Sequence, residues 1–318
     1  MSDDVGPPHA GTVASFGSVN IDVVAYPDRL PVPGETVHAL RYALSLGGKG
    51  ANQAAAVARL GQAVELAGRT GDDAFGGMAR EALARFGVGT RGLGTDLVHP
   101  TGIALIGVEA SGENAIIVAG GANMALDSSD VVRGGDVLDR ARVLLLQLEV
   151  PVEASLGAAR RARAAGARII LDPAPAPEGP LPDALWQMVD ILTPNESETE
   201  VLVGLRPRTP EDGLKAAGRL LDLGIGCAVV KLGARGVAFR TARESGFVPP
   251  FRVLSVDTVA AGDCFNAGLA VALVRGDTMA AAIRFAAACG ALATTRPGAA
   301  EAAPTLAEVQ ALLRARPG

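Results

Sequence analysis

The sequence has few aromatic residues and few cysteines, and it lacks long hydrophobic runs; each shortage narrows the class of protein. Aromatic residues make up 3% of the 318 residues, so a core has to be built from Ala, Val, Leu and Ile. The three cysteines follow no metal-binding or disulfide spacing, which predicts buried thiols in a reducing compartment. No apolar run approaches the ~18 residues of a membrane span, and the first residues lack the features of a signal peptide. We therefore expect a cytoplasmic protein with no membrane association.

Positive charge is not in excess either. The formal net charge of −5 argues against a nucleic-acid partner, because such proteins usually present a basic surface. Apolar residues make up 49% of the chain and charged residues 20%, which is typical of a globular enzyme. The Gly- and Pro-containing stretch 1–11 is expected to be a flexible tail before one domain over residues 12–316.

Short apolar runs alternate with Ala-rich stretches that carry apolar residues at helical spacing. This alternation predicts an αβα sandwich of the Rossmann type, with a mostly parallel central sheet. The predicted strands are 13–16, 64–66, 143–148, 169–171, 191–192 and 227–232. The predicted helices are 50–60, 74–86, 152–165, 212–223, 262–275, 278–294 and 306–314.

Two segments break the alternation. Residues 35–45 and 102–118 alternate apolar with polar residues, the second around a turn at 110–114, and no crossover helix follows either one. They predict a small antiparallel sheet that acts as a lid, inserted in the domain as segments of about 17–46 and 99–122.

Polar residues gather where the predicted strands end. In an open parallel sheet, ligands bind beyond the carboxyl ends of the strands. We therefore expect a polar ligand at this edge of the sheet. The residues at these ends are Asn20, Asp22, Glu149, Asp172, Asn195, Lys231 and Gly233.

A glycine-rich run, Gly47-Gly48-Lys49-Gly50-Ala51-Asn52, leads directly into a helix. Glycines at such a place let a ligand approach the backbone, and the free amides lie at the positive end of the helix dipole. An ordinary turn would explain the glycines but not Lys49 and Asn52. The run is not a Walker A loop, because Gly50 stands where that loop needs Ser or Thr.

A second run of small residues, from Asp257 to Gly268, opens the helix predicted at 262–275. The unpaired amides at its start can hold an anion such as a phosphoryl group in transfer. Asp263 lies in the first turn, where an acidic residue is often merely favoured by the dipole. Beside an anion hole, it can also be the base that takes a proton from a hydroxyl group.

The chain resembles the ribokinase-like (PfkB) family of carbohydrate kinases over residues 12 to 316. The resemblance rests on several ordered motifs. These are Gly17–Asp22 (GSVNID), Pro33–Thr36 (PGET), GGKGANQ ending at Gln53, TGDD at 70–73, QLE at 147–149, DPAPA at 172–176, TPNE at 193–196 and the segment 257–266.

This resemblance implies an ATP-dependent sugar kinase that uses Mg²⁺ and a monovalent cation, K⁺, and that forms a homodimer through the lid. The family's base falls on Asp263, with the amides of Ala260, Ala261 and Gly262 as the anion hole. The implied sugar-binding residues are Asn20, Asp22, Gly48, Lys49, Asn52, Glu149 and Asp263. The implied nucleotide-binding residues are Asn195, Lys231, Leu232, Gly233, Ala234, Arg235, Gly236, Gly262 and Ala287. Glu198 falls on the magnesium-associated position, and the implied cation site comprises Asp257, Val259, Ala293, Arg296 and Gly298.

Some positions depart from the family pattern. Lys231 stands where Thr is frequent beside the nucleotide phosphates, and a Lys there can still contact them. Ala287 and Ala302 replace polar residues that are common near the adenine and the cation.

The expected substrate is D-ribose, phosphorylated on its terminal hydroxyl group, because the implied sugar site is rich in hydrogen-bonding groups and aromatic residues that could stack a base are scarce. The alternatives are another kinase of the family (acting on deoxyribose, fructose, a nucleoside or a sugar acid), a sugar- or nucleotide-binding regulator without catalysis, and a nicotinamide-dependent dehydrogenase.

Overall fold

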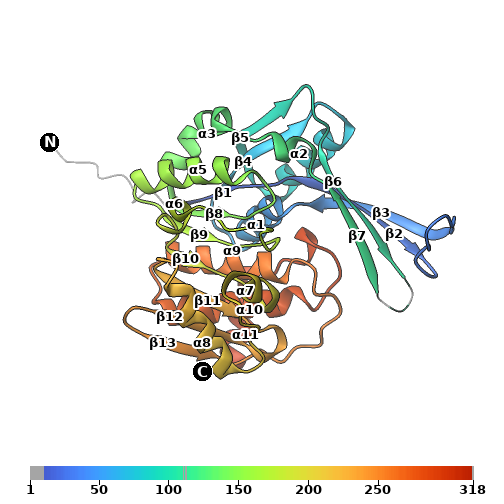
Figure 1. The fold of residues 1–318 in the computed structure, drawn as a ribbon. Helices are drawn as coiled ribbons and strands as arrows, with labels where there is room; N and C mark the ends of the chain where they lie inside the picture. Colours follow the sequence, from blue (N-terminus) through green and yellow to red (C-terminus); the bar gives the residue numbers. More distant parts are fainter. Residues whose placement is uncertain (1–10, 110, 112, 317–318) are drawn as a thin grey trace.

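The computed structural model describes residues 11–109, 111 and 113–316. Its centre is a nine-stranded sheet (Figure 1). The strand order is β13-β12-β11-β10-β9-β8-β1-β4-β5, parallel from β11 to β5 and antiparallel at the β11–β12–β13 edge. The strands are β1 (Thr12–Phe16), β4 (Val64–Gly71), β5 (Gly89–Asp96), β8 (Ala141–Leu146), β9 (Arg168–Leu171), β10 (Ile191–Leu192), β11 (Cys227–Lys231), β12 (Val237–Thr241) and β13 (Ser245–Val248). Residues 1–10 of the predicted tail lie outside the described residues.

Helices cover both faces of this sheet, and each layer has its own buried apolar cluster. One layer contains α1 (Lys49–Arg59), α2 (Ala74–Phe86), α9 (Ala261–Val274), α10 (Met279–Ala293) and α11 (Leu306–Ala315). The other contains α3 (Ser128–Arg133), α4 (Gly135–Arg140), α5 (Val152–Ala164), α6 (Asp183–Trp186), α7 (Glu196–Val203) and α8 (Pro210–Leu221). The prediction of an αβα sandwich is therefore confirmed.

Four strands form a second sheet that projects from this body (Figure 1). They are β2 (Asn20–Pro27), β3 (Ala39–Gly47), β6 (Gly102–Val108) and β7 (Asn114–Ala119), in the order β3-β2-β6-β7. The predicted lid sheet is confirmed, and both of its hairpins are antiparallel. The two hairpins are joined by β2 and β6, which pair in parallel. A parallel pair needs a long connection, and here β4 and β5 of the main sheet lie between β2 and β6 in the chain. Residues 110 and 112 of the expected turn lie outside the described residues.

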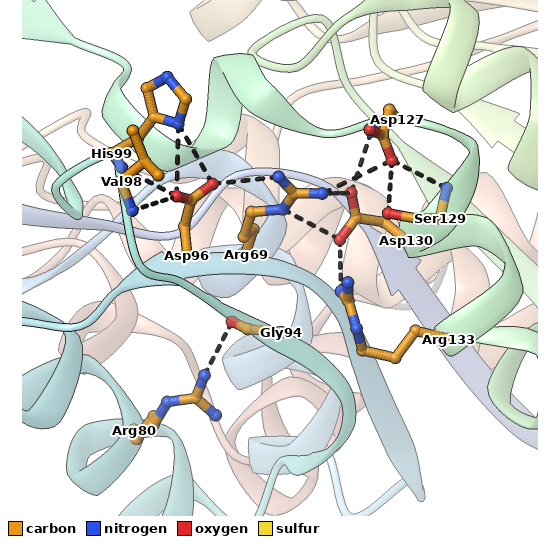
Figure 2. A network of polar contacts seen from close by, with 10 residues as sticks. All are labelled: Arg69, Arg80, Gly94, Asp96, Val98, His99, Asp127, Ser129, Asp130 and Arg133. Atoms are coloured by element: carbon orange, nitrogen blue, oxygen red, sulfur yellow. Dashed lines mark hydrogen bonds and ion pairs between the residues drawn. The ribbon is translucent and has the colours of Figure 1, made fainter.

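A network of charged residues fixes the segment that enters lid strand β6 (Figure 2). Asp96, at the end of β5, accepts hydrogen bonds of 2.8 Å from the backbone amides of Val98 and His99. Arg69 of β4 pairs with Asp96 at 3.0 Å and also with Asp130, which is fully buried and pairs with Arg133 as well. The base of the lid is thereby joined to the edge of the main sheet.

Strands β2, β5, β12 and β13 and helices α3, α4, α6 and α7 were not among the predicted elements. Strand β5 contains three glycines in eight residues, a composition that predicts no strand. The structure requires at least one of them, since a side chain at Gly92 would begin 2.8 Å from the Cβ of Ala67. Close contact between neighbouring strands thus overrides local propensity.

Candidate active site

A cavity of about 680 Å³ opens at the carboxyl ends of the parallel strands. Its lining includes Lys49, Asn195, Glu198, Lys231, Gly262 and Asp263, which come from four places in the sequence. Of the residues expected at strand ends, Asp172, Asn195, Lys231 and Gly233 line this cavity, so the expectation that such residues meet at one edge is correct for these four.

The glycine-rich run forms the start of α1 as predicted. Gly48 has φ = 85° and precedes the helix; a side chain there would begin 2.8 Å from the backbone nitrogen of Asn20. The amide of Lys49 donates to Glu149 Oε2 at 3.0 Å, and Ser18 Oγ donates to the same oxygen. Glu149 therefore helps to neutralise the positive end of α1, and within the described ranges its other carboxylate oxygen accepts no hydrogen bond.

Asn20 and Asp22 do not lie at the end of a main-sheet strand; they belong to lid strand β2. Asn123, from η1 (Gly121–Ala125), donates from Nδ2 to Asn20 Oδ1 at 2.7 Å. This bond fixes the orientation of the Asn20 amide, so that its NH₂ group is left to donate to a ligand. Burial raises the pKa of Asp22 to about 7, and the carboxylates of Glu149 and Glu301 add to the rise. The lid therefore contributes Asn20 and Asp22 to the set of polar residues that was expected at the edge of the main sheet.

Helix α9 begins with an anion-binding geometry. Ala260 precedes it in the left-handed conformation, with φ = 56°, the only non-glycine residue with positive φ within the described ranges. No side chain caps the helix, and no acceptor is bonded to the amides of Gly262 and Asp263 in the part of the chain that the structure describes. The amide of Ala261 already donates to the carbonyl of Thr258 at 3.3 Å. Of the three amides expected to form the anion hole, those of Ala260 and Gly262 are therefore unpaired across the described residues, and the amide of Asp263 joins them.

Asp263 is 5% exposed and receives hydrogen bonds from two neighbouring side chains of α1. Gln53 Nε2 donates to Oδ1 at 3.0 Å, and Asn52 Nδ2 approaches Oδ2 at 3.4 Å. Burial raises the pKa of Asp263 to about 6; the Lys49 ammonium group opposes this rise, and the Asp172 carboxylate adds to it. The group can thus gain and lose a proton near neutral pH, as a general base must.

Lys49 provides the opposite charge in the same cavity. Burial by itself lowers the pKa of Lys49, but the carboxylates of Asp263 and Asp172 outweigh that effect, and the pKa is raised. Lys49 is therefore charged at neutral pH and can pair with an anionic ligand.

Asn195 and Glu198 form a reciprocal capping box at the start of α7. Asn195 Oδ1 accepts from the Glu198 amide at 2.9 Å, and Glu198 Oε2 accepts from the Asn195 amide at 2.7 Å. Asn195 Nδ2 donates to the second carboxylate oxygen at 2.8 Å. The pair thus has a structural role as well as a place in the cavity lining.

Two of the expected nucleotide-binding residues do not present their side chains to the cavity. The Leu232 side chain is fully buried in the core, and Arg235 pairs with Glu196 at the surface. Gly233, Ala234, Gly236 and Ala287 do line the cavity. The segment after β11 therefore borders the cavity mainly through its small residues, with Lys231 as its charged side chain.

The expected cation-binding segments are brought together by Asp257. Its Oδ1 accepts from the amide of Val259 at 3.0 Å, and its Oδ2 accepts from the amide of Gly298 at 3.1 Å. Across the described residues, the carbonyls of Val259, Ala293, Arg296 and Gly298 receive no hydrogen bond. Ala293 cannot have its usual helical donor, because residue 297 is Pro. Such free carbonyl oxygens are suitable ligands for a weakly hydrated cation, whereas the Arg296 side chain pairs with Glu308.

Two residues in contact with the site were not predicted. Gln53 is the last residue of the GGKGANQ motif, and its position on α1 next to Asn52 could have indicated a role. Asn123 follows Gly120 and Gly121, and nothing in its sequence context indicates that it binds Asn20, 103 residues away.

The site combines a buried base beside free amides with a cavity that contains two lysines and with a lid. These are the features of an enzyme that transfers a phosphoryl group to a hydroxyl group. Residues 10–306 match the model of the pfkB family carbohydrate kinases, and the chain belongs to this family.

Individual relatives agree with this result. Ribokinase of Haemophilus influenzae is 38% identical over 297 residues, which cover 93% of this chain and 96% of the relative. The solved structure of Arabidopsis thaliana ribokinase with ribose and ATP has a TM-score of 0.88 and 35% identity, and the match covers 96% of this chain and 99% of that one. Deoxyribokinase of Salmonella typhi is 33% identical, with 92% of this chain and 96% of the relative covered.

No helix among the described residues is both long and apolar enough to cross a membrane. All three cysteines are buried and unpaired, as predicted.

Proposed function

We propose that the protein transfers the terminal phosphoryl group of ATP to the terminal hydroxyl group of D-ribose, giving D-ribose 5-phosphate and ADP. The observation that carries this proposal is the position of Asp263, which lies beside the unpaired amides of α9, in contact with α1 and near the polar residues of the lid. The similarity to ribokinases over most of the chain supports the choice of ribose.

In this reaction Asp263 accepts the proton of the sugar hydroxyl group, and the oxygen forms a bond to the γ-phosphorus as the bond to the ADP oxygen breaks. The amides at the start of α9 receive the negative charge that develops on the phosphoryl oxygens. Lys49 is placed to pair with the same charge. The side chains of Asn20, Asp22, Asn52 and Glu149 hold the sugar hydroxyl groups.

The nucleotide occupies the large cavity. Small residues of the segment after β11 and Ala287 of α10 line the part of the cavity that we assign to its base and ribose, and we assign the phosphates to Asn195 and Lys231, which also line the cavity.

Magnesium fits the carboxylates present. Mg²⁺ usually keeps several waters and binds through one or two carboxylates together with substrate phosphates. Glu198 lines the cavity, and among the residues that the structure describes each of its carboxylate oxygens accepts one hydrogen bond. A second lone pair on each oxygen can therefore bind a metal ion. No cluster of three or more His, Cys, Asp or Glu that could hold a metal occurs within residues 11–109, 111 and 113–316. Glu198 would therefore hold Mg²⁺ only together with the nucleotide, whose phosphate charge the ion would neutralise.

A monovalent cation, K⁺, would bind between Asp257 and the carbonyls of Val259, Ala293, Arg296 and Gly298. Because Asp257 lies just before the first turn of α9, a cation there would stiffen the anion hole without contact with the substrate.

The exposed surface of the lid supports the proposed homodimer. Tyr42 of β3 is 74% exposed and Ile117 of β7 is 67% exposed. The neighbours of Ile117, Ile116 and Val118, are also exposed, so both faces of the lid sheet present apolar side chains to solvent. A second copy that covers one face would remove the exposure on that face. Light scattering should give the mass of a dimer, and Tyr42→Glu should give a monomer while Val132→Glu, on α3, should not.

The substrate is tested by ADP release in a coupled assay with D-ribose, deoxyribose, fructose and adenosine under one set of conditions. We expect ribose to have the highest kcat/KM. A higher value for another acceptor would replace ribose by that substrate, and the absence of ADP release with every acceptor would favour a sugar-binding regulator.

A further inference from the structure

Gln53 and Gln147 form a pair of buried amides next to the base. Gln53 belongs to α1, and Gln147 is the first residue after β8, 94 positions further along the chain. Both residues are fully buried, and neither lines the nucleotide cavity. Gln147 Nε2 donates to Gln53 Oε1 at 2.7 Å. The pair can therefore influence a ligand only through the residues that it contacts.

The charge around Gln53 decides which way its amide points. Gln53 Nε2 lies 3.0 Å from Asp263 Oδ1 and 3.4 Å from Asp172 Oδ2. An amide oxygen in that position would face two carboxylates, so the NH₂ group has to lie there. Gln53 Oε1 is then turned away from the base and needs a donor, which Gln147 Nε2 provides. Gln147 therefore stabilises the one orientation in which Gln53 can donate to Asp263.

The other end of the Gln147 amide has an unpaired acceptor. Its Oε1 is buried and has no hydrogen-bond partner among the residues that the structure describes. It lies against the backbone of Gly17, where a Cβ atom would overlap it. A buried acceptor without a partner destabilises a fold. If Gln147 only filled space, an apolar side chain of the same length would serve better, so the unpaired oxygen indicates a role beyond packing.

We propose that Gln147 is a positioning residue for the general base, which acts by holding the Gln53 amide in the orientation that donates to Asp263. The inference rests on the proposed function, in which Asp263 takes the proton of the sugar hydroxyl group. Gln147 contacts neither the substrate nor the base; it acts through Gln53 alone.

The hydrogen bond from Gln53 also affects the titration of the base. Burial raises the pKa of Asp263 to about 6, and the bond from Gln53 opposes this rise. A weaker bond should therefore raise the pKa further and leave less of the carboxylate ionised at neutral pH.

Other charged groups face Asp263 from several elements. Lys49 of α1 lowers its pKa, and the carboxylates of Asp172, after β9, and Glu149, after β8, raise it. Asp22 of the lid also interacts with Asp263. A change at Gln147 keeps all four of these groups, so a shift in the titration of the base would report the hydrogen bond itself.

The main variant is Gln147→Met, which keeps the length of the side chain but removes both the donor and the unpaired oxygen. Gln310→Met, the same change at an exposed position of α11, is the control. We expect kcat at pH 7 to fall roughly 3- to 10-fold, the range for one neutral hydrogen bond. The KM for ribose should stay nearly unchanged. The loss should become smaller toward pH 9, because the fall in activity assigned to Asp263 moves to higher pH.

A mutant cycle shows whether Gln147 acts through Gln53. Gln53→Met removes the donor to the base, so its effect on kcat and on the pH profile should be larger than that of Gln147→Met. In Gln53→Met/Gln147→Met the second change should add nothing, because the contact through which it acts is already lost. The double variant leaves neither amide of the pair without its partner, so this comparison remains a test even if Gln147→Met fails to fold.

An equal loss of kcat at every pH from 5 to 9, or values equal to those of Gln310→Met, would overturn the positioning role. Losses that multiply in the double variant would show that Gln147 does not act through Gln53, and would overturn it too. The titration of the Asp263 carboxyl group, followed by carbon-13 NMR and assigned with Asp263→Asn, measures the shift without turnover. An unshifted titration in Gln147→Met would reject this inference alone, whereas a wild type that releases no ADP with any acceptor would reject the proposed function.

Discussion

The side-chain amide of Gln53 donates a hydrogen bond of 3.0 Å to the carboxylate of Asp263. The two residues are 210 positions apart in the sequence, and both are buried. The bond fixes one oxygen of the carboxylate and leaves the other near the weaker donor Asn52. The base is therefore held in one orientation, with Oδ2 free to accept a proton.

Replacing Asp263 by Asn should remove the base while preserving the size of the side chain. We expect kcat to fall by roughly 10²–10⁴-fold, the usual contribution of a general base, with ribose affinity changed far less. The comparison variant is Asp183→Asn, at an exposed position of α6. Near-normal turnover of Asp263→Asn at saturating ribose and ATP would contradict the assignment.

Activity should fall as the pH is lowered from 8 to 5. Burial raises the pKa of Asp263 to about 6 and that of Asp22 to about 7. A base must be unprotonated, so activity is present above these values and is lost as the pH falls through them. We expect kcat/KM for ribose to decline between pH 8 and pH 5, and Asp22→Asn to leave only the decline near pH 6. A flat profile over this range would show that neither carboxylate titrates in the free enzyme.

Potassium should stimulate the reaction. Replacing sodium by potassium at constant ionic strength should raise kcat, because a large cation can use the free carbonyls beside Asp257. Asp257→Asn should abolish the difference between the two salts. Equal rates of the wild type in potassium, sodium and a bulky organic cation would rule out the site.

Deoxyribose should be a poorer substrate than ribose. A site that pairs a hydroxyl group leaves its own buried polar groups unsatisfied when that hydroxyl is missing, at a cost of about 1–3 kcal/mol. We expect kcat/KM to differ by roughly 10-fold, and Asp22→Ala to narrow the difference if Asp22 binds a ring hydroxyl. Equal values for the two sugars in the wild type would show that the missing hydroxyl is not recognised.

Arg69→Met should destabilise the fold where the lid is attached. The change leaves buried Asp130 with Arg133 as its remaining arginine partner and removes the arginine partner of Asp96, which keeps its hydrogen bonds from the amides of Val98 and His99 (Figure 2). We expect a loss of about 3 kcal/mol in the free energy of unfolding, measured with urea, which is the lower end of the range for a broken buried pair. Arg163→Met breaks an exposed pair with Asp190 and should cost less than about 1 kcal/mol. Similar losses in both variants would show that the network in Figure 2 adds nothing beyond a surface pair.

The sequence by itself determined the layers of the fold and the local parts of the site. Alternating apolar runs and amphipathic stretches depend on spacing along the chain, so they predicted the parallel sheet, most of its helices and the lid. The glycines before α1 and the small residues before α9 are also local signals. The capping box of Asn195 and Glu198 is local too; its Asn-x-x-Glu spacing indicates the start of a helix, although α7 was not among the predicted elements.

Only the tertiary structure decided which of these parts touch. Gln53 meets Asp263, Asp172 meets Lys231 and Asn123 meets Asn20 because separate strands and helices end at the same edge of the sheet. The same packing directs Leu232 into the core and Arg235 to the surface, although both belong to one segment beside the cavity. Contacts over such distances depend on how the layers pack together, and spacing along the chain carries no information about them.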